Sequence, residues 1–146
     1  TRLCLEWLER NVSEGCSVLD YGCGSGILAI AAARLGAARV AGVDIDPQAV
    51  EAARSNAERN GVVALFADSA QPVAGEYDVV VANILSNPLR VLAPAICAHV
   101  RSGGLLALSG ILREQAEEIM AIYAQWLPMQ VADMREDWVC LAGVKP

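Results

Sequence analysis

Hydrophobic and polar positions follow two different periods along the chain. Short apolar runs rich in β-branched residues or leucine occupy residues 17–20, 40–44, 62–66, 78–82 and 105–109, and each run predicts a strand. Between these runs, apolar residues recur at three- and four-residue intervals, which predicts helices over residues 3–10, 26–35, 47–60, 87–100 and 114–126. Strands that alternate with helices in this way are typical of a mainly parallel α/β sheet with helices on both faces.

Local signals mark several ends of these elements. Asp46 is placed to cap the third helix, with Pro47 in its first turn and an Asn-Gly pair at residues 60–61 closing it. Pro94 lies inside the fourth helical pattern and is expected to bend that helix. Residues 102–104, Ser-Gly-Gly, are expected to form the turn into the fifth strand.

The last part of the sequence predicts a hairpin. Residues 129–135 and 138–144 resemble two strands joined at residues 136–137. Two strands this close in sequence must be antiparallel, because a parallel pair needs a crossover of about a dozen residues. The whole pattern predicts one domain, residues 1–146, built on a seven-stranded, mainly parallel sheet with a C-terminal antiparallel hairpin. Since the chain begins inside an amphipathic helix, we expect a fragment of a longer protein.

Composition places the chain among folded proteins. Of its 146 residues, 55% are hydrophobic and 19% are charged, which excludes a disordered tail. No apolar run reaches the roughly 20 residues of a membrane span, so no membrane partner is expected. Five cysteines and one histidine lack metal-ligand spacing, so no metal site is predicted, and unpaired cysteines suit a reducing cytoplasm.

The charge balance bears on partners. The net charge is −6, and no cluster of basic residues occurs. Direct nucleic-acid binding is therefore not expected, because proteins that grip a phosphate backbone usually carry a basic stripe. An acidic surface suits a basic protein partner or a small cation instead.

A glycine-rich turn carries the first chemical signal. Asp20 ends the first predicted strand, and Gly22, Gly24 and Gly26 follow at every second position. Glycines let the backbone pass close to a ligand, although a tight packing turn is an alternative interpretation. A nicotinamide site would place a pyrophosphate here, which Asp20 would repel. The ammonium and sulfonium of S-adenosyl-L-methionine would be attracted instead, so this cofactor is predicted.

Three further aspartates follow predicted strands or begin them. Asp44 ends the second strand, where an acid can accept hydrogen bonds from ribose hydroxyls; a helix cap is the alternative, but Asp46 already fills that role. Asp68 follows the third strand, where it could bind the adenine amine or simply be a solvated loop residue. Asp78, at the start of the fourth strand, is interpreted as structural.

Asn83, Ile84 and Leu85 follow the fourth strand, where ligands bind in such sheets. The side-chain carbonyl of Asn83 can accept a hydrogen bond from an amine and so position it for methyl transfer; a turn-forming role is the alternative. An amine such as lysine must lose its proton before it can react. No histidine or carboxylate beside Asn83 offers itself as a base, so no proton acceptor is assigned.

With these residues in place, the chain resembles the bacterial methyltransferases of large-subunit ribosomal protein eleven. The resemblance is carried by the glycine motif at residues 18–30, Gly-Val-Asp-Ile-Asp-Pro at 42–47, Val-Ala-Asn-Ile-Leu at 81–85, Ser-Gly-Ile-Leu at 109–112, Gln-Ala-Glu at 115–117, and Trp138 with Leu141, Gly143 and Lys145. It implies a Rossmann-like class I methyltransferase fold and a cofactor site made of Asp20, Gly22, Cys23, Gly24, Gly26, Asp44, Ile45, Asp68 and Asn83. It also implies that Asn83, with Ile84 and Leu85, meets the amine.

The resemblance further implies a function and a missing part. Family members methylate lysine side-chain and N-terminal amines of a basic ribosomal protein and carry an N-terminal substrate-recognition domain with a linker. Residues 1–5 look like those just after that linker, so both parts are expected to be absent here. We expect a cytoplasmic, monomeric protein. The alternatives are a methyltransferase of RNA or a small molecule, a catalytically silent S-adenosylmethionine-binding module, and, most distantly, a nicotinamide oxidoreductase.

Overall fold

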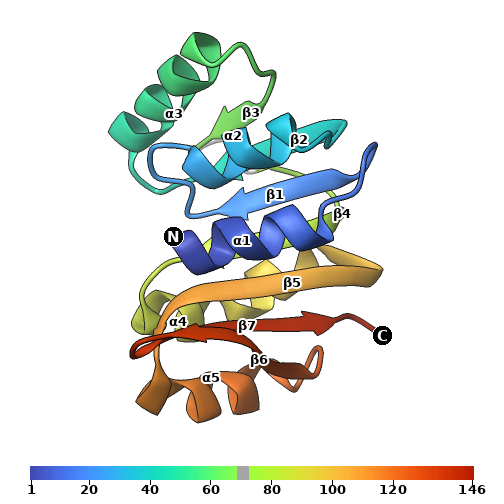
Figure 1. Ribbon diagram of the computed structural model, residues 1–146, viewed down its shortest axis with the longest axis vertical. Coiled ribbons are helices and arrows are strands. Elements are labelled where there is room, and N and C mark those ends of the chain that lie inside the picture. The colour runs from blue at the N-terminus through green and yellow to red at the C-terminus, as the bar shows by residue number, and fades with distance from the viewer. Residues whose placement is uncertain (69–72) are drawn as a thin grey trace.

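The computed structural model describes residues 1–68 and 73–146, and there seven strands form one sheet in the order β3-β2-β1-β4-β5-β7-β6 (Figure 1). The first five strands are parallel to one another, and β7 is antiparallel to both β5 and β6. The predicted Rossmann-like class I fold is confirmed. The strands are β1 (Ser17–Tyr21), β2 (Arg39–Val43), β3 (Leu65–Ala67), β4 (Tyr77–Asn83), β5 (Val100–Leu112), β6 (Met129–Arg135) and β7 (Trp138–Val144).

Helices cover both faces of this sheet (Figure 1). They are α1 (Arg2–Asn11), α2 (Ile27–Arg34), α3 (Pro47–Arg59), α4 (Ser86–Ala98) and α5 (Ala116–Tyr123), with a short 3₁₀ turn, η1 (Arg113–Gln115), before α5. The apolar sides of α1, α2 and α3 pack into one core, and those of α4 and α5 pack into a second core on the opposite face. Successive residues of β1 belong to different cores, because successive side chains of a strand point to opposite faces. Val18 packs in the first core and Leu19 in the second.

Most predicted elements occur where the pattern indicated. Asp46 caps α3 by accepting a hydrogen bond from the Gln48 backbone N–H at 2.9 Å, and Pro47 is the first residue of that helix. The hairpin strands match the predicted ranges, and Glu136 in their turn adopts a positive φ of 55°. Helix α4 continues through Pro94, which is exposed.

Two predicted strands begin well away from the expected residue, while the first, second and fourth differ from their predicted ranges by no more than one residue at either end. The third strand begins at Leu65 rather than at residue 62, because the Val62 backbone N–H is bonded to the Ala57 carbonyl and completes the turn out of α3. The fifth strand begins at Val100, which the pattern had assigned to a helix and which pairs with Tyr77. Residues 102–104 are therefore not a turn but part of β5, where the register with β4 shifts.

The helix predicted over residues 114–126 was also wrong in its bounds. It divides into η1 and α5, and α5 ends at Tyr123. Tyr123 is buried, and its hydroxyl donates to the Leu89 carbonyl at 2.8 Å, which ties α5 to α4. Trp126 lies in the turn that follows, with its backbone N–H bonded to the Tyr123 carbonyl.

Lys145 is the single lysine of the sequence. Its Nζ donates hydrogen bonds to the carbonyls of Cys97 and Val100, both at 2.9 Å. Cys97 belongs to the last turn of α4, where carbonyls lack partners within the helix and a cation is favourable. Lys145 thus joins the end of the chain to α4 and β5.

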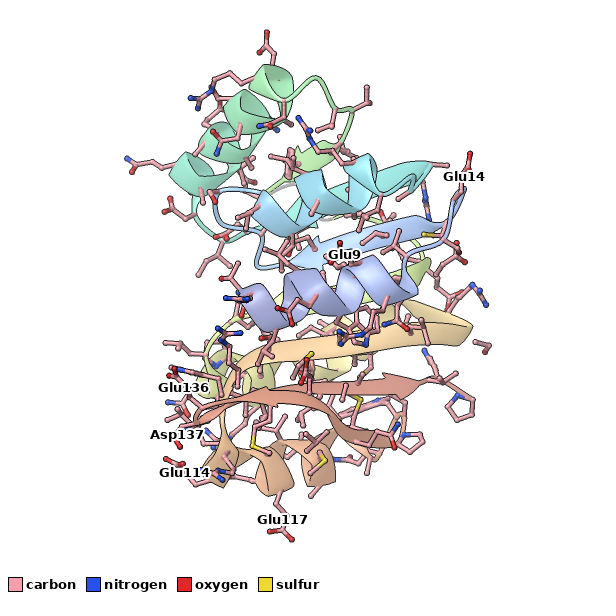
Figure 2. The ribbon with its side chains drawn as sticks, in the orientation of Figure 1. Glu9, Glu14, Glu114, Glu117, Glu136 and Asp137 are labelled. Carbon is pink, nitrogen blue, oxygen red and sulfur yellow. The ribbon has the colours of Figure 1, made fainter. Side chains whose placement is uncertain are left out.

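Acidic side chains extend from the surface on several elements (Figure 2). Glu9 and Glu14 lie at α1 and just after it, while Glu114, Glu117, Glu136 and Asp137 surround the hairpin turn and the start of α5. Within the described residues, no helix is long and apolar enough to cross a membrane.

Candidate active site

The predicted site residues gather where the parallel strands end. Gly22 follows β1, Asp44 follows β2, and Asn83 is the last residue of β4, opposite Ser109 of β5. Because β1, β2, β4 and β5 are parallel, their carboxyl ends lie along one edge of the sheet. The order of strands reverses between β1 and β4, and the crevice at such a reversal is where ligands bind in open α/β sheets.

The glycines of the turn after β1 have different roles. All three have positive φ angles, 82° at Gly22, 52° at Gly24 and 87° at Gly26. A Cβ on Gly22 would lie 2.5 Å from Cγ2 of Ile84, and one on Gly26 would lie 3.0 Å from Cβ of Ala53. A Cβ on Gly24 would meet nothing within 4 Å. Gly22 and Gly26 therefore satisfy packing, while the open space at Gly24 is what a ligand cradle requires.

Asp44 is bonded to this turn. Its Oδ2 accepts a hydrogen bond from the Gly24 backbone N–H at 2.8 Å, and its Oδ1 accepts one from the Asp46 backbone N–H at 3.0 Å. The Gln48 backbone N–H, by contrast, is bonded to Asp46. The alternative interpretation of Asp44 as the helix cap is therefore wrong, and its carboxylate faces the glycine turn.

Asp20 lies beneath the turn rather than in a cavity wall. It is 1% exposed, and its Oδ2 accepts a hydrogen bond from the Ala29 backbone N–H in α2 at 3.1 Å. Its Oδ1 has no hydrogen-bond partner among the described residues. Burial, opposed by the Ala29 hydrogen bond and assisted by the charge of Asp44, raises the pKa of Asp20 to about 7. A nearby cation would favour the ionised form of this carboxyl group.

A first cavity of about 250 Å³ brings together five of the predicted residues: Gly22, Asp44, Ile45, Asp68 and Ile84. The rest of its wall is mainly apolar, with Tyr21 and His99 adding two rings whose centroids are 6.1 Å apart. A mainly apolar wall with a few carboxylates suits a ligand that combines a flat ring with hydroxyl groups.

A second cavity of about 430 Å³ adjoins the first. Asn83, Ile84 and Leu85 line it, together with Gly110 of β5 and Trp138 of β7. Ile84 belongs to the walls of both cavities, so the two spaces meet at this residue.

The amide of Asn83 is oriented by the first residue of the chain. Its Nδ2 donates a hydrogen bond to Oγ1 of Thr1 at 2.9 Å. With the nitrogen engaged in this way, Oδ1 is the atom that can accept a hydrogen bond from an incoming group.

Cys23 contributes its backbone, and not its thiol, to the glycine turn. Its side chain is 5% exposed and packs in the first core, where burial raises the pKa of the thiol to about 12, helped by the charges of Asp20 and Asp44. Its backbone N–H is bonded to the Val43 carbonyl at 2.8 Å, as is that of Gly22. The thiol is thus a neutral core group, and the backbone helps to hold the turn.

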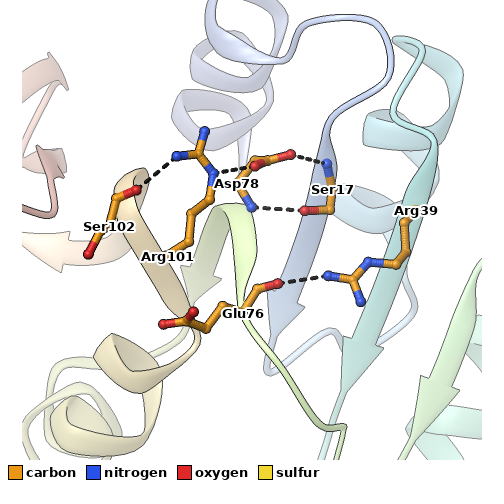
Figure 3. A network of polar contacts seen from close by, with 6 residues as sticks. All are labelled: Ser17, Arg39, Glu76, Asp78, Arg101 and Ser102. Carbon is orange, nitrogen blue, oxygen red and sulfur yellow. Dashed lines mark hydrogen bonds and ion pairs between the residues drawn. The ribbon is translucent and has the colours of Figure 1, made fainter.

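Asp78 lies at the opposite end of β4 from Asn83, as its structural interpretation predicted. Its Oδ2 accepts a hydrogen bond from the Ser17 backbone N–H at 2.8 Å, and its own backbone N–H donates to Ser17 Oγ at 2.9 Å (Figure 3). Arg101 forms an ion pair with the other carboxylate oxygen, and the side chain of Arg39 donates to the Glu76 carbonyl at 2.7 Å. These contacts fasten β1, β2, β4 and β5 together away from the cavities.

Several residues of the site were not predicted from the sequence pattern. His99 belongs to no motif, and Thr1 and Tyr21 lie in family-like stretches but were not predicted as site residues. All three line the cavities in the fold. Gly110 was noticed only as part of the Ser-Gly-Ile-Leu stretch. Among residues 1–68 and 73–146, no group of three or more histidine, cysteine, aspartate or glutamate side chains is arranged to hold a metal ion.

Comparison with known proteins agrees with this geometry. The family model described as "Ribosomal protein L11 methyltransferase (PrmA)" matches residues 1–146. A ribosomal protein L11 methyltransferase of Dechloromonas aromatica is 89% identical over 146 residues, which are all of this chain and 49% of that protein. The chain thus spans about half the length of the curated relatives it matches.

Solved structures give the same result for the fold. The crystal structure of a ribosomal protein L11 methylase from Lactobacillus delbrueckii subsp. bulgaricus has a TM-score of 0.89 and 34% identity, covering 99% of this chain and 77% of that one. A T. thermophilus 16S rRNA methyltransferase, solved in complex with AdoMet and guanosine, has a TM-score of 0.82 and 24% identity, covering 99% of this chain and 42% of that one.

Proposed function

The chain belongs to the ribosomal protein L11 methyltransferase (PrmA) family, and we propose that it is the catalytic half of an enzyme that methylates that ribosomal protein. The methyl donor is S-adenosyl-L-methionine, which leaves as S-adenosylhomocysteine. The acceptors are lysine side-chain amines and the N-terminal amine of the substrate. The observation that carries this proposal is the meeting of two cavities at Ile84, one beside the glycine turn and one beside Asn83.

The residues of the first cavity and the turn fit the proposed cofactor. Gly24 leaves space for it, Asp44 offers a carboxylate to ribose hydroxyls, and Asp68 is assigned to the adenine amine. Ile45, at the mouth of the same cavity, offers an apolar contact to the adenine ring. The unpartnered Oδ1 of Asp20 supplies negative charge beneath the turn, on the side proposed for the cationic amino-acid end of the cofactor.

The second cavity is proposed as the place of the substrate amine. Bound in the first cavity, S-adenosylmethionine supplies an activated methyl group for in-line displacement by an amine. Asn83 Oδ1 accepts a hydrogen bond from that amine and aims its lone pair, while Thr1 keeps the amide in the required orientation. Ile84 and Leu85 give the amine an apolar surrounding, which favours its neutral form.

We further propose that this chain is the C-terminal part of a two-part protein whose N-terminal half recognises the substrate. This would account for the half-length match to the curated relatives. The net charge of −6 suits a basic protein substrate and gives no reason to expect direct binding of nucleic acid. Five free cysteines suit a reducing cytoplasm, and we propose a monomer there.

Two measurements test the proposal. Calorimetry of the chain with S-adenosylmethionine, S-adenosylhomocysteine and NAD should give binding of the first two only, and binding of NAD alone would overturn the cofactor assignment. For activity, the chain is joined to the N-terminal half of its Dechloromonas aromatica relative to give an extended chain. Mass spectrometry of ribosomal protein L11 incubated with this extended chain should show methylated amines. Methylation of RNA instead, or of nothing, would contradict the proposed substrate.

A further inference from the structure

Ile84 lies between two glycines that come from different strands. Gly22 follows β1, and its missing Cβ would lie 2.5 Å from Cγ2 of Ile84. Gly110 lies in β5, and its missing Cβ would lie 2.7 Å from the Ile84 carbonyl oxygen and 3.3 Å from Asn83 Oδ1. Heavy atoms without a hydrogen bond between them do not approach this closely, so any larger residue at either position would displace Ile84.

The same residue forms the boundary between the two cavities. Ile84 lines the cavity beside the glycine turn and also the cavity beside Asn83. Asn83 precedes it directly, so a shift of the Ile84 backbone moves the amide oxygen that faces the second cavity. The positions of Ile84 and Asn83 thus depend on a glycine of β5 that lines the second cavity.

Backbone conformation alone does not account for the requirement for glycine at position 110. Its φ is +83°, a value that favours glycine, but Gly15 has a φ of +87° with nothing within 4 Å of its missing Cβ. Gly15 therefore needs glycine for its φ only, whereas Gly110 needs it for its φ and for the close approach of Ile84. Substitutions at Gly15 and Gly110 therefore distinguish the effect of the positive φ from the effect of the close approach of Ile84.

We propose that Gly110 and Gly22 hold Ile84 in a fixed position beside the point where the cofactor methyl group and the amine meet, which makes Gly110 and Ile84 positioning residues for methyl transfer. The Ile84 side chain in this position limits the distance and angle at which the amine nitrogen approaches the methyl group. Displacements of about 1 Å in such an arrangement can lower a rate by about 100-fold. This inference rests on the proposed function of the two cavities.

The test compares Gly110→Ala with Gly15→Ala in the extended chain. Both variants place a Cβ on a residue of nearly equal φ, but only Gly110→Ala pushes on Ile84. We expect Gly110→Ala to lower kcat at least 10-fold while the Kd for S-adenosylmethionine changes less than about threefold. Gly15→Ala should leave kcat and Kd as they are. Equal kcat values in the two variants, or a kcat loss matched by an equal loss of cofactor affinity, would overturn the proposal.

Ile84→Ala provides a second test, because this substitution shortens a side chain and so introduces no steric clash. It removes the side chain that limits the approach of the amine, so kcat should fall at least 10-fold, with a smaller change in cofactor Kd. This measurement stands even if Gly110→Ala does not fold. An unchanged kcat would overturn the proposal. Failure of the proposed function is recognised separately, because the unsubstituted extended chain would then leave ribosomal protein L11 unmethylated.

Discussion

The carboxylate of Asp44 accepts a hydrogen bond from the backbone N–H of Gly24 over 2.8 Å. This bond joins the end of β2 to the turn after β1, at the glycine with open space beside it. The Asp44 side chain thus holds the turn and also faces the first cavity. Its removal should weaken cofactor binding both by loosening the turn and by removing a carboxylate from the cavity wall.

Asp44→Ala is expected to raise the Kd for S-adenosylmethionine by roughly 10-fold to 100-fold, because a hydrogen bond to a charged group contributes about 1.5–3 kcal/mol. Isothermal calorimetry measures this directly. The control is Asp46→Ala, which removes the cap of α3 at a cost of about 1 kcal/mol of stability but leaves the cavity intact. An unchanged Kd in Asp44→Ala would rule out the proposed ribose contact.

Asn83→Ala should lower the kcat of the extended chain by roughly 100-fold and change the cofactor Kd much less, because the amide positions the amine. Steady-state kinetics on ribosomal protein L11 separate the two quantities. Asn11→Ala is a suitable control, since Asn11 donates a hydrogen bond to the Trp7 carbonyl at the C-terminal end of α1. Wild-type turnover in Asn83→Ala would remove this residue from the mechanism.

Asp20 should make stability depend on pH in the absence of cofactor. Its folded-state pKa of about 7 lies above the ordinary value of 3.8, so the folded chain binds more protons between these values. The free energy of unfolding should therefore fall as pH rises from about 4 to about 7 and level off above that. Urea unfolding across this range measures the effect, and Asp20→Asn should reduce it.

The same carboxyl group predicts proton release when the cofactor binds. A cation placed near Asp20 lowers its pKa, so binding at pH 6 should release a proton, and binding at pH 8.5 should not. Calorimetry in two buffers of different ionisation enthalpy counts the protons. If the wild-type chain and Asp20→Asn release equal numbers, Asp20 does not respond to the ligand.

Asp78 should affect stability but not function. The hydrogen bonds from Arg101 and Ser17 hold its pKa below the ordinary value, so its contribution is present above about pH 4 and is lost as pH falls through the lowered pKa. Asp78→Ala should lower the free energy of unfolding at pH 7 by about 1–2 kcal/mol, a modest figure because the ion pair is partly exposed. The cofactor Kd should not change; a large rise would link this network to the site.

The sequence was sufficient to predict the order of elements, because strands and helices differ in hydrophobic period. It failed where tertiary contacts outweigh local signals. Residues 102–104 have turn composition, yet the Gly103 N–H and the Gly104 carbonyl are bonded to Lys145, which keeps them in β5. Val100 continues a helical apolar pattern, yet it pairs with Tyr77 in the sheet.

The sequence predicted those site residues that lie at or just after the carboxyl ends of the strands. Gly22, Asp44 and Asn83 lie where the motif and strand positions indicated. The burial of Asp20 beneath the turn and its hydrogen bond to the start of α2 were not predicted from the sequence, because they depend on how α2 packs on β1. His99, at the end of α4, lines the first cavity, and Thr1, just before α1, lines the second. No local sequence pattern predicts these placements, because each depends on how distant segments pack together.

The position of Lys145 has a consequence for an enzyme proposed to act on amines. The only lysine of the chain has its ammonium group engaged by two carbonyls at the end of α4. A methyltransferase whose own surface carried free lysines would be exposed to automethylation. Residues 1–146 offer no unengaged ε-amine as a competing acceptor, so methylated lysines detected in these assays are expected in the substrate or in the joined N-terminal half.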